Sequence, residues 1–252
     1  MAKKKTIMVE EPFLPGLQDN SYPKEKTLNF KVKLKCKNAK QKEFFNILKD
    51  RSKEIVFGVG SAGAGKTYVA MSEALSELRD GLCDKIIFIT PTIEAGSAAT
   101  KIGLLPGTAE EKIAPYMENM RDTITKILRS GGNYNPEEVA KSLLKDERVA
   151  VKLMNYARGT TYDNSIVIID EGENFNKGEM LLLLTRIGEN TRYFILGSEL
   201  QSDRRDIKTD GGSGMMYAYE KLSELEEVGS VEFTDDDVVR NPIIGKILKL
   251  WN

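Results

Sequence analysis

Apolar and polar positions along the chain form two kinds of pattern that alternate. Short runs of β-branched and aromatic residues, typical of buried strands, are separated by longer stretches in which apolar positions have helical spacing. The runs predict strands at residues 55–59, 85–90, 149–154, 165–169, 192–197 and 230–234. The longer stretches predict helices at residues 40–50, 66–79, 108–129, 135–146, 177–187, 214–225 and 241–250. Strands that alternate with helices form a mostly parallel sheet covered on both faces, so we expect one α/β domain over residues 38–252.

Residues 1–37 show a different pattern. The first 27 residues are rich in Lys, Pro, Glu and Asn without periodicity, which is typical of a flexible arm. Residues 30–37, FKVKLKCK, alternate apolar and cationic side chains with period two, which predicts a strand with one lysine face. Such a face suits the phosphates of a nucleic acid, but lysines also protect an edge strand from aggregation. The pattern alone leaves both readings open.

The composition excludes several kinds of chemistry. The 252 residues include no histidine, which excludes histidine-based catalysis and His-ligated metals. The chain has two cysteines, Cys36 and Cys83, and their spacing fits neither a zinc site nor a disulfide framework. No apolar run approaches the roughly 18 to 20 residues of a membrane helix, and the N-terminus lacks the apolar core of a signal peptide. We therefore expect no membrane partner and a cytoplasmic protein, in the host cytoplasm if the source is viral.

Charge is distributed unevenly. Residues 1–50 carry 12 Lys and 6 acidic residues, a net charge of +6, whereas the whole chain has a net charge of −1, so the remainder carries −7. This asymmetry supports a basic arm or face near the N-terminus.

Residues 60–67, GSAGAGKT, match G-x-x-x-x-G-K-[ST] between a predicted strand and a predicted helix. Glycines let backbone N–H groups turn toward phosphate oxygens, and the helix N-terminus adds its positive dipole end. We expect Lys66 to neutralise the β and γ phosphates of ATP and the Thr67 hydroxyl to bind Mg²⁺. The predicted nucleotide-binding residues are Gln41, Gly60, Ser61, Ala62, Gly63, Ala64, Gly65, Lys66, Thr67 and Tyr68. The alternative is a glycine-rich turn that binds no nucleotide.

An acidic pair follows the apolar run at 165–169. A strand that ends at Asp170 places this carboxylate at the edge of the sheet where the phosphate loop also opens. Asp170 suits the outer shell of Mg²⁺, and Glu171 suits the base that orients and activates water. Two acids that cap the next helix are the alternative. A water-activating glutamate also argues against a small-molecule kinase.

Four further polar residues are candidates for the same site. Gln41 precedes the phosphate loop and suits an adenine edge, although a glutamine that faces solvent fits equally well. Gln201 follows a predicted strand and suits a γ-phosphate sensor, or a plain loop. Arg158 suits a contact to phosphate or to a neighbouring subunit, and Arg240 suits an arginine finger in cis or from a neighbour. The alternative for each is a surface arginine. The acidic run at 235–237 is most simply a helix cap.

Seven segments in this order resemble the PhoH-like ATPases, a phosphate-starvation-associated family related to superfamily 1 helicases. They are GSAGAGKTYVA, TPTIEAG, IGLLPGTAEEKIAPYMENM, YARGTT, IVIIDEGENF, LLLLTRIG and DDDVVRNPIIGKI. The resemblance covers roughly residues 38–250 and implies a RecA-like P-loop core that hydrolyses ATP. It also implies a ring oligomer of hexameric type, with RNA or other single-stranded nucleic acid as substrate.

The resemblance also assigns residues. Gly65, Lys66 and Thr67 match the phosphate motif, and Asp170 and Glu171 match the acidic pair. Four more fall on positions that the family usually fills in the same way: Arg158, Arg186, Gln201 and Arg240. The chain departs from the family at Thr90, usually arginine, at Gly172 and Glu173, usually Ala-Gln, and at Ser198, usually aspartate. Some relatives carry a fused nuclease domain, whereas this sequence ends at Asn252, which suits a viral genome such as that of a phage.

Two hypotheses of different classes follow. The first is a Mg²⁺-dependent ATPase that acts as a helicase-like or translocase-like motor on single-stranded nucleic acid, with Lys66, Glu171, Gln201, Arg158 and Arg240 as catalytic residues. Because the chain has sequence for one lobe of a RecA-like core, the complete site needs a neighbouring copy. The second is a nucleotide-responsive oligomeric scaffold or regulator with weak hydrolysis, motivated by Glu173 and Ser198. A small-molecule phosphotransferase is a third, weaker alternative.

Overall fold

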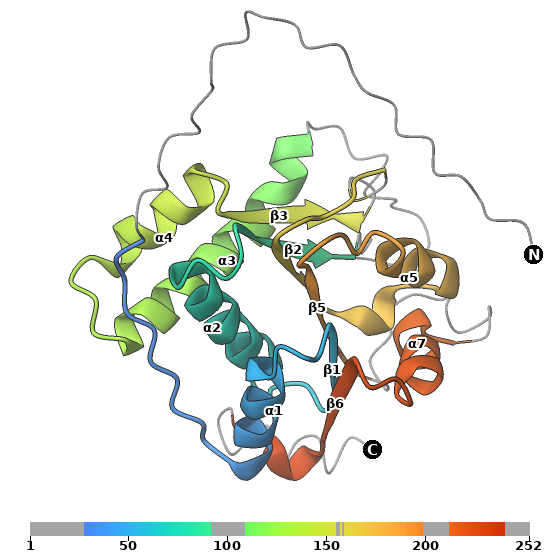
Figure 1. Cartoon of the computed structure of the whole chain (residues 1–252). Coiled ribbons are helices and arrows are strands. Elements are labelled where there is room, and N and C mark those ends of the chain that lie inside the picture. Colours follow the sequence, from blue (N-terminus) through green and yellow to red (C-terminus); the bar gives the residue numbers. More distant parts are fainter. Residues whose placement is uncertain (1–27, 92–108, 155–156, 158, 199–211, 240–252) are drawn as a thin grey trace, which may run out of the picture.

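Six parallel strands form the centre of the molecule (Figure 1). The computed structural model describes residues 28–91, 109–154, 157, 159–198 and 212–239. The strands are β1 (Ile55–Gly60), β2 (Lys85–Thr90), β3 (Val149–Leu153), β4 (Ser165–Ile169), β5 (Arg192–Gly197) and β6 (Val228–Phe233), in the order β3-β2-β4-β5-β1-β6. Strand β5 therefore lies between β1, which leads into the glycine-rich loop, and β4, which leads into the acidic pair.

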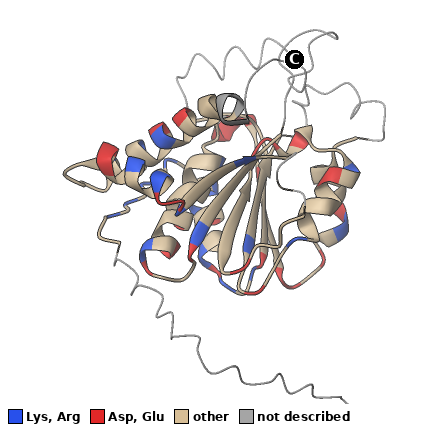
Figure 2. Ribbon diagram, turned by 90° about the horizontal axis from the view of Figure 1, so that it is seen from above, with Lys and Arg blue, Asp and Glu red and all other residues tan. Residues whose placement is uncertain are grey.

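Helices cover both faces of the sheet (Figure 2). They are α1 (Ala39–Lys49), α2 (Lys66–Arg79), α3 (Ala109–Ser130), α4 (Pro136–Lys145), α5 (Lys177–Leu184) and α7 (Gly214–Leu222), with short 3₁₀ turns η3 (Gly172–Asn174) and η4 (Asp235–Asp237). Successive strand residues point to opposite faces, so the apolar runs feed two cores. In β4, Ile166 and Ile168 pack in the core under α1 to α4, and Val167 and Ile169 pack in the core under α5 and α7.

Residues 30–37 are not a strand, contrary to the prediction from their period of two. The segment is extended but pairs with no strand among the described residues. Its backbone bonds to the end of α3 instead: the Lys31 N–H donates to Asn133 Oδ1 at 2.8 Å, and Ser130 Oγ donates to the Lys33 carbonyl at 3.3 Å. The alternation is real, because the apolar side chains pack on the helical core while the lysines face solvent.

Two helices end earlier than the sequence predicts. Helix α5 begins with a capping box formed by Asn176 and Glu179 and ends at Leu184, because Ile187 leaves the helix to form a parallel bridge with Tyr162. Helix α7 ends at Leu222, and β6 starts two residues before its predicted start. The predicted helix at 241–250 lies outside the described residues. In the described part of the chain, no helix is long and apolar enough to cross a membrane.

Candidate nucleotide-binding site

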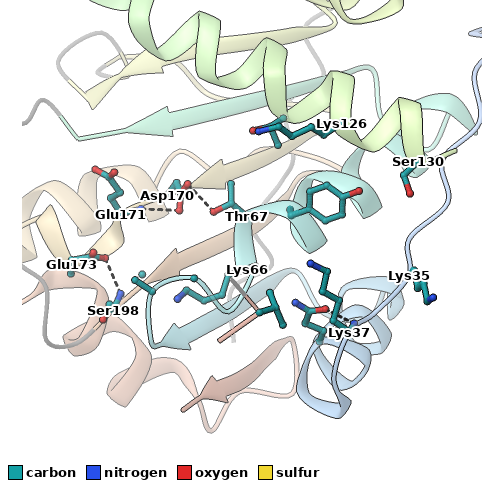
Figure 3. A pocket seen from close by; sticks show the side chains of 18 of the residues that line it. Lys35, Lys37, Lys66, Thr67, Lys126, Ser130, Asp170, Glu171, Glu173 and Ser198 are labelled. Carbon is teal, nitrogen blue, oxygen red and sulfur yellow. Dashed lines mark hydrogen bonds between the residues drawn. The ribbon is translucent and has the colours of Figure 1, made fainter. Parts of the chain in front are cut away.

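A cavity of about 1370 Å³ opens at the carboxyl ends of β1, β4 and β5 (Figure 3). The glycine-rich loop and the start of α2 form its floor. Three acidic residues and Ser198 line one end of it, Lys35 and Lys37 line the other with Lys66 between them, and Lys126 extends over the cavity from α3 (Figure 3). Its lining residues include Gln41, Ala62, Gly63, Gly65, Lys66, Thr67, Tyr68, Asp170 and Glu171 from the sequence-predicted set.

The loop between β1 and α2 has the backbone that a phosphate cradle needs. Gly60, Gly63 and Gly65 all have positive φ angles, of 115°, 84° and 84°. Such angles disfavour side chains and let successive N–H groups point inward. A Cβ atom on Gly60 would lie 1.9 Å from the Phe233 carbonyl oxygen, so the site requires glycine there on two counts. Helix α2 starts directly after Gly65, which directs its N-terminal N–H groups at the cavity.

Lys66 is held inside this loop. Its ammonium donates to the carbonyl oxygens of Gly60 at 2.6 Å and Ser61 at 2.9 Å, and it lies 5.9 Å from the centre of the Phe233 ring. The side chain is buried, yet it lines the cavity. Its charge therefore lies where a phosphate cradled by the loop would need a counter-charge.

Thr67 and Asp170 meet across the sheet edge. Thr67 Oγ1 donates to Asp170 Oδ2 at 2.9 Å, and the Glu171 N–H donates to Asp170 Oδ1 at 3.0 Å. Burial raises the pKa of Asp170, while the Thr67 bond, the Glu171 N–H and the nearby Lys66 oppose that rise. A hydroxyl and a carboxylate are hard oxygen donors, and Mg²⁺ is commonly bound by one or two carboxylates together with substrate phosphates. The donor set therefore fits Mg²⁺, held by Thr67 and Asp170.

Glu171 has a left-handed backbone, with φ of 52°, and an exposed side chain in the cavity lining. A residue other than glycine rarely adopts this conformation, and such residues are concentrated at functional sites. The turn at Glu171 ends β4 and starts η3, so the two neighbouring acids line the same end of the cavity (Figure 3).

Glu173 and Ser198, two positions at which the sequence departs from the family pattern, form one unit. The Ser198 N–H donates to Glu173 Oε2 at 2.9 Å, both residues are buried, and both line the cavity. Burial raises the pKa of Glu173, and the Ser198 N–H opposes that rise. The bond ties the end of β5 to η3 beside the acidic pair. The sequence held one sign of this contact: the motif that follows the acidic pair and the motif at the end of β5 both depart from the PhoH-like pattern.

Gln41 is buried under the phosphate loop. Its Nε2 donates to the Ala64 carbonyl at 2.7 Å, and its Oε1 accepts the Lys37 N–H at 2.8 Å. Gln41 thus links the loop to the segment 30–37. The hydrogen bond from Gln41 to an adenine edge stays a prediction, as do the assigned roles of the other site residues.

Three further predicted residues fall in parts of the chain that the structure does not describe, and one lies away from the cavity. Gln201, Arg158 and Arg240 lie outside the described residues. Arg186 follows α5 and does not line the cavity; its carbonyl accepts the Tyr162 N–H at 3.1 Å. The acidic run at 235–237 does act as a cap: Asp237 accepts the Thr234 N–H at 2.9 Å, and Asp235 accepts the Ser61 hydroxyl at 2.5 Å beside the phosphate loop.

The far end of the cavity was not predicted. Lys35 and Lys37 reach it from the extended segment, and Thr123, Lys126 and Ser130 line the cavity from α3. The positions 123, 126 and 130 have the spacing of one helix face, which was the available signal. Nothing in the spacing indicated that this face and the lysine row would share a cavity with the phosphate loop.

Comparisons with known proteins agree with this geometry. The family model described as "PhoH-like protein" matches residues 33–252. A PhoH-like protein of Bacillus subtilis is 32% identical over 236 residues, which is 93% of this chain and 69% of that protein. Protein PhoH of Escherichia coli K12 is 32% identical over 203 residues, which is 80% of this chain and 54% of that protein. The chain thus spans between about half and two thirds of these relatives' lengths.

Among solved structures, a large terminase from a thermophilic bacteriophage, in complex with ADP, superposes with a TM-score of 0.51 at 13% identity. The match covers 84% of this chain and 48% of the terminase. At this identity the likeness shows the fold alone: a RecA-like P-loop NTPase core, as the sequence predicted.

Proposed function

The chain belongs to the PhoH-like protein family, and from this premise we propose that it is a Mg²⁺-dependent ATPase whose hydrolysis is coupled to single-stranded nucleic acid. Family and fold support a nucleotide-binding ATPase. The observation that carries the proposal is the bond between Thr67 and Asp170 beside the caged Lys66. A phosphate cradle and a metal-binding pair that converge at one sheet edge are what transfer of a γ-phosphoryl group requires.

The chain's own groups divide the work of hydrolysis. The loop N–H groups, the N-terminus of α2 and the Lys66 ammonium bind the phosphates and stabilise charge on their oxygens. Mg²⁺, held by Thr67 and Asp170, would neutralise charge on the β and γ oxygens. Glu171 orients a water molecule and accepts its proton as the oxygen bonds to the γ-phosphorus. The bond from that phosphorus to the bridging oxygen breaks, and ADP and phosphate leave.

The proposed function also includes an arginine that stabilises charge in the transition state. Arg158 or Arg240 supplies it, in cis or from a neighbouring copy. Gln201 serves as the γ-phosphate sensor. We propose a homo-oligomeric ring, of hexameric type, in the cytoplasm, or in a host's cytoplasm if the source is viral.

One observation favours the alternative, a nucleotide-responsive scaffold with weak hydrolysis. Glu173 occupies a buried position of the cavity next to the acidic pair, where its ionised form would add negative charge close to the proposed γ-phosphate. Substitution Glu173→Gln keeps an oxygen for the Ser198 N–H and removes that charge. Faster hydrolysis by this variant would support a site attenuated by Glu173.

Phosphate release tests the proposed function. The full chain is assayed with ATP and Mg²⁺, alone and with single-stranded RNA or DNA, beside Lys66→Ala and the surface variant Lys85→Gln. We expect ATP hydrolysis that a nucleic acid stimulates. The hydrolysis rate should fall about 100-fold or more in Lys66→Ala and stay at the wild-type value in Lys85→Gln. Hydrolysis equal to wild type in Lys66→Ala would refute the assigned site.

A further inference from the structure

Five lysines form a row that ends inside the nucleotide cavity. Lys31, Lys33, Lys35 and Lys37 are exposed at every second position of the extended segment, and the exposed Lys126 lines the same cavity from α3. We call these five residues the lysine track. Successive members on the segment are about 7 Å apart, since an extended chain rises about 3.4 Å per residue.

The backbone of the segment fixes the direction of the track. Lys31 is bound to Asn133 beyond the end of α3, and Lys33 is bound to Ser130 in its last turn. Lys35 and Lys37 then reach the cavity rim, where Figure 3 shows them at the end opposite the acids, while Lys126 extends over the cavity from α3. The positive charge thus runs from the surface of α3 to the edge of the phosphate loop.

The charges of the cavity end of the track are unpaired within the described part of the chain. Its three lysines, Lys35, Lys37 and Lys126, form no ion pair there. Neighbouring cations do: Lys40 pairs with Glu43 at 3.1 Å, and Arg129 pairs with Glu137. Clustered unpaired lysines repel one another, so they gain most from an anion that bridges them.

A row favours a polymeric anion over a compact one. The phosphates of a nucleoside triphosphate belong at the loop and Lys66, on the other side of Gln41, so they do not reach Lys31 or Lys33. A chain of phosphodiesters can contact each lysine in turn along the segment. We propose, as a refinement of the proposed function, that the backbone of single-stranded nucleic acid binds along the lysine track and enters the ATP cavity at its lysine end.

The same geometry supplies a route by which strand and nucleotide affect each other. The Lys37 N–H is bonded to Gln41 Oε1 at 2.8 Å, and Gln41 Nε2 is bonded to the Ala64 carbonyl in the phosphate loop at 2.7 Å. A strand that moves the segment at Lys37 therefore moves the loop through one side chain. Gln41 acts here as a positioning residue, and the two ligands bind with a coupling free energy that is reciprocal.

Binding of labelled oligonucleotides tests the track. Anisotropy of fluorescein-labelled 20-nucleotide RNA and DNA strands is measured from low to high salt with the full chain and with Lys35→Gln/Lys37→Gln/Lys126→Gln. We expect the triple variant to bind at least about tenfold more weakly, with a salt slope smaller by about 2, because each phosphate contact on a single strand contributes about 0.7. The control is Lys85→Gln/Lys145→Gln, which removes two exposed lysines, one at the start of β2 and one at the end of α4, and it should bind like wild type. Wild-type affinity in the triple variant would overturn the proposal. Displacement of the strand from the track by a nucleoside bisphosphate, a compact anion, would overturn it as well.

The coupling is tested by the ratio of strand affinities with and without saturating ADP and Mg²⁺. We expect a ratio of about 5 to 150 in the wild type and close to 1 in Gln41→Ala, whatever that variant does to either affinity alone. An unchanged ratio would refute the route through Gln41. Strand binding along the track without ATP hydrolysis would refute the proposed ATPase and leave the track intact, whereas hydrolysis without strand binding would refute the track alone.

Discussion

Gly60 joins β1 to the phosphate loop at a φ of 115°, with its Cα packed against the Phe233 carbonyl. The sequence predicted this residue, and the rest of the loop and the acidic pair, because their spacing carries the chemistry. It did not predict the bond between Glu173 and Ser198 or the approach of Lys126, because residues 25 or more positions apart meet only through the strand order of the sheet.

Alanine substitutions test how strictly the loop needs glycine. Gly60→Ala would place a Cβ 1.9 Å from the Phe233 oxygen, whereas Gly81→Ala, at φ 69°, meets nothing within 4 Å. We expect Gly81→Ala to lower the free energy of unfolding by about 1 kcal/mol, the cost of a positive φ alone. Gly60→Ala should lower it by about 3 kcal/mol or more and weaken ATP binding. Equal losses in urea titrations of the two variants would contradict the close approach.

At the scale of elements, the sequence predicted most strands and helices because each apolar run is buried on both faces or on one clear stripe. The segment at residues 30–37 was assigned wrongly as a strand. Alternation with period two indicates an extended chain with one buried side. An extended segment that packs on helices shows the same alternation as a strand in a sheet. The ends of α5 and α7 were misplaced because local bridges and turns, rather than composition, end them.

Helix α2 carries a pH-sensitive element on its buried side. Burial, with the nearby Glu77, raises the pKa of Glu73 to about 7. The pKa of Glu73 is higher in the folded than in the unfolded protein. Protonated Glu73 therefore contributes fully to the free energy of unfolding below about pH 4.5, and this contribution is lost as pH rises through about 7.

Glu73→Gln should remove this dependence. We expect the variant to be more stable than wild type at pH 8 by about 1 to 2 kcal/mol, and close to it at pH 5, because the amide cannot ionise. Urea titrations at both pH values measure the difference. The same stability difference at pH 5 and pH 8 would show that Glu73 titrates normally.

Across the whole molecule, one cavity has an acidic end, where we propose phosphoryl transfer, and a lysine end, where we propose that a polyanion enters, joined by the phosphate loop (Figure 3). This polarity is a property of the fold, because the carboxyl ends of β1, β4 and β5 bring the acids together while the segment at residues 30–37 and α3 bring the lysines. Sequence patterns predicted the two halves separately and gave no sign that they meet.

The proposed function makes this cavity the site of ATP hydrolysis, with Glu171 as the base. The most direct measurement is single-turnover hydrolysis of ATP by Glu171→Gln, with ATP binding measured on the same sample by a fluorescent analogue. We predict binding within a factor of about three of wild type and hydrolysis slower by about 10²- to 10⁴-fold, since the amide keeps the shape of the side chain and cannot accept a proton. Hydrolysis at the wild-type rate with normal binding would contradict the account.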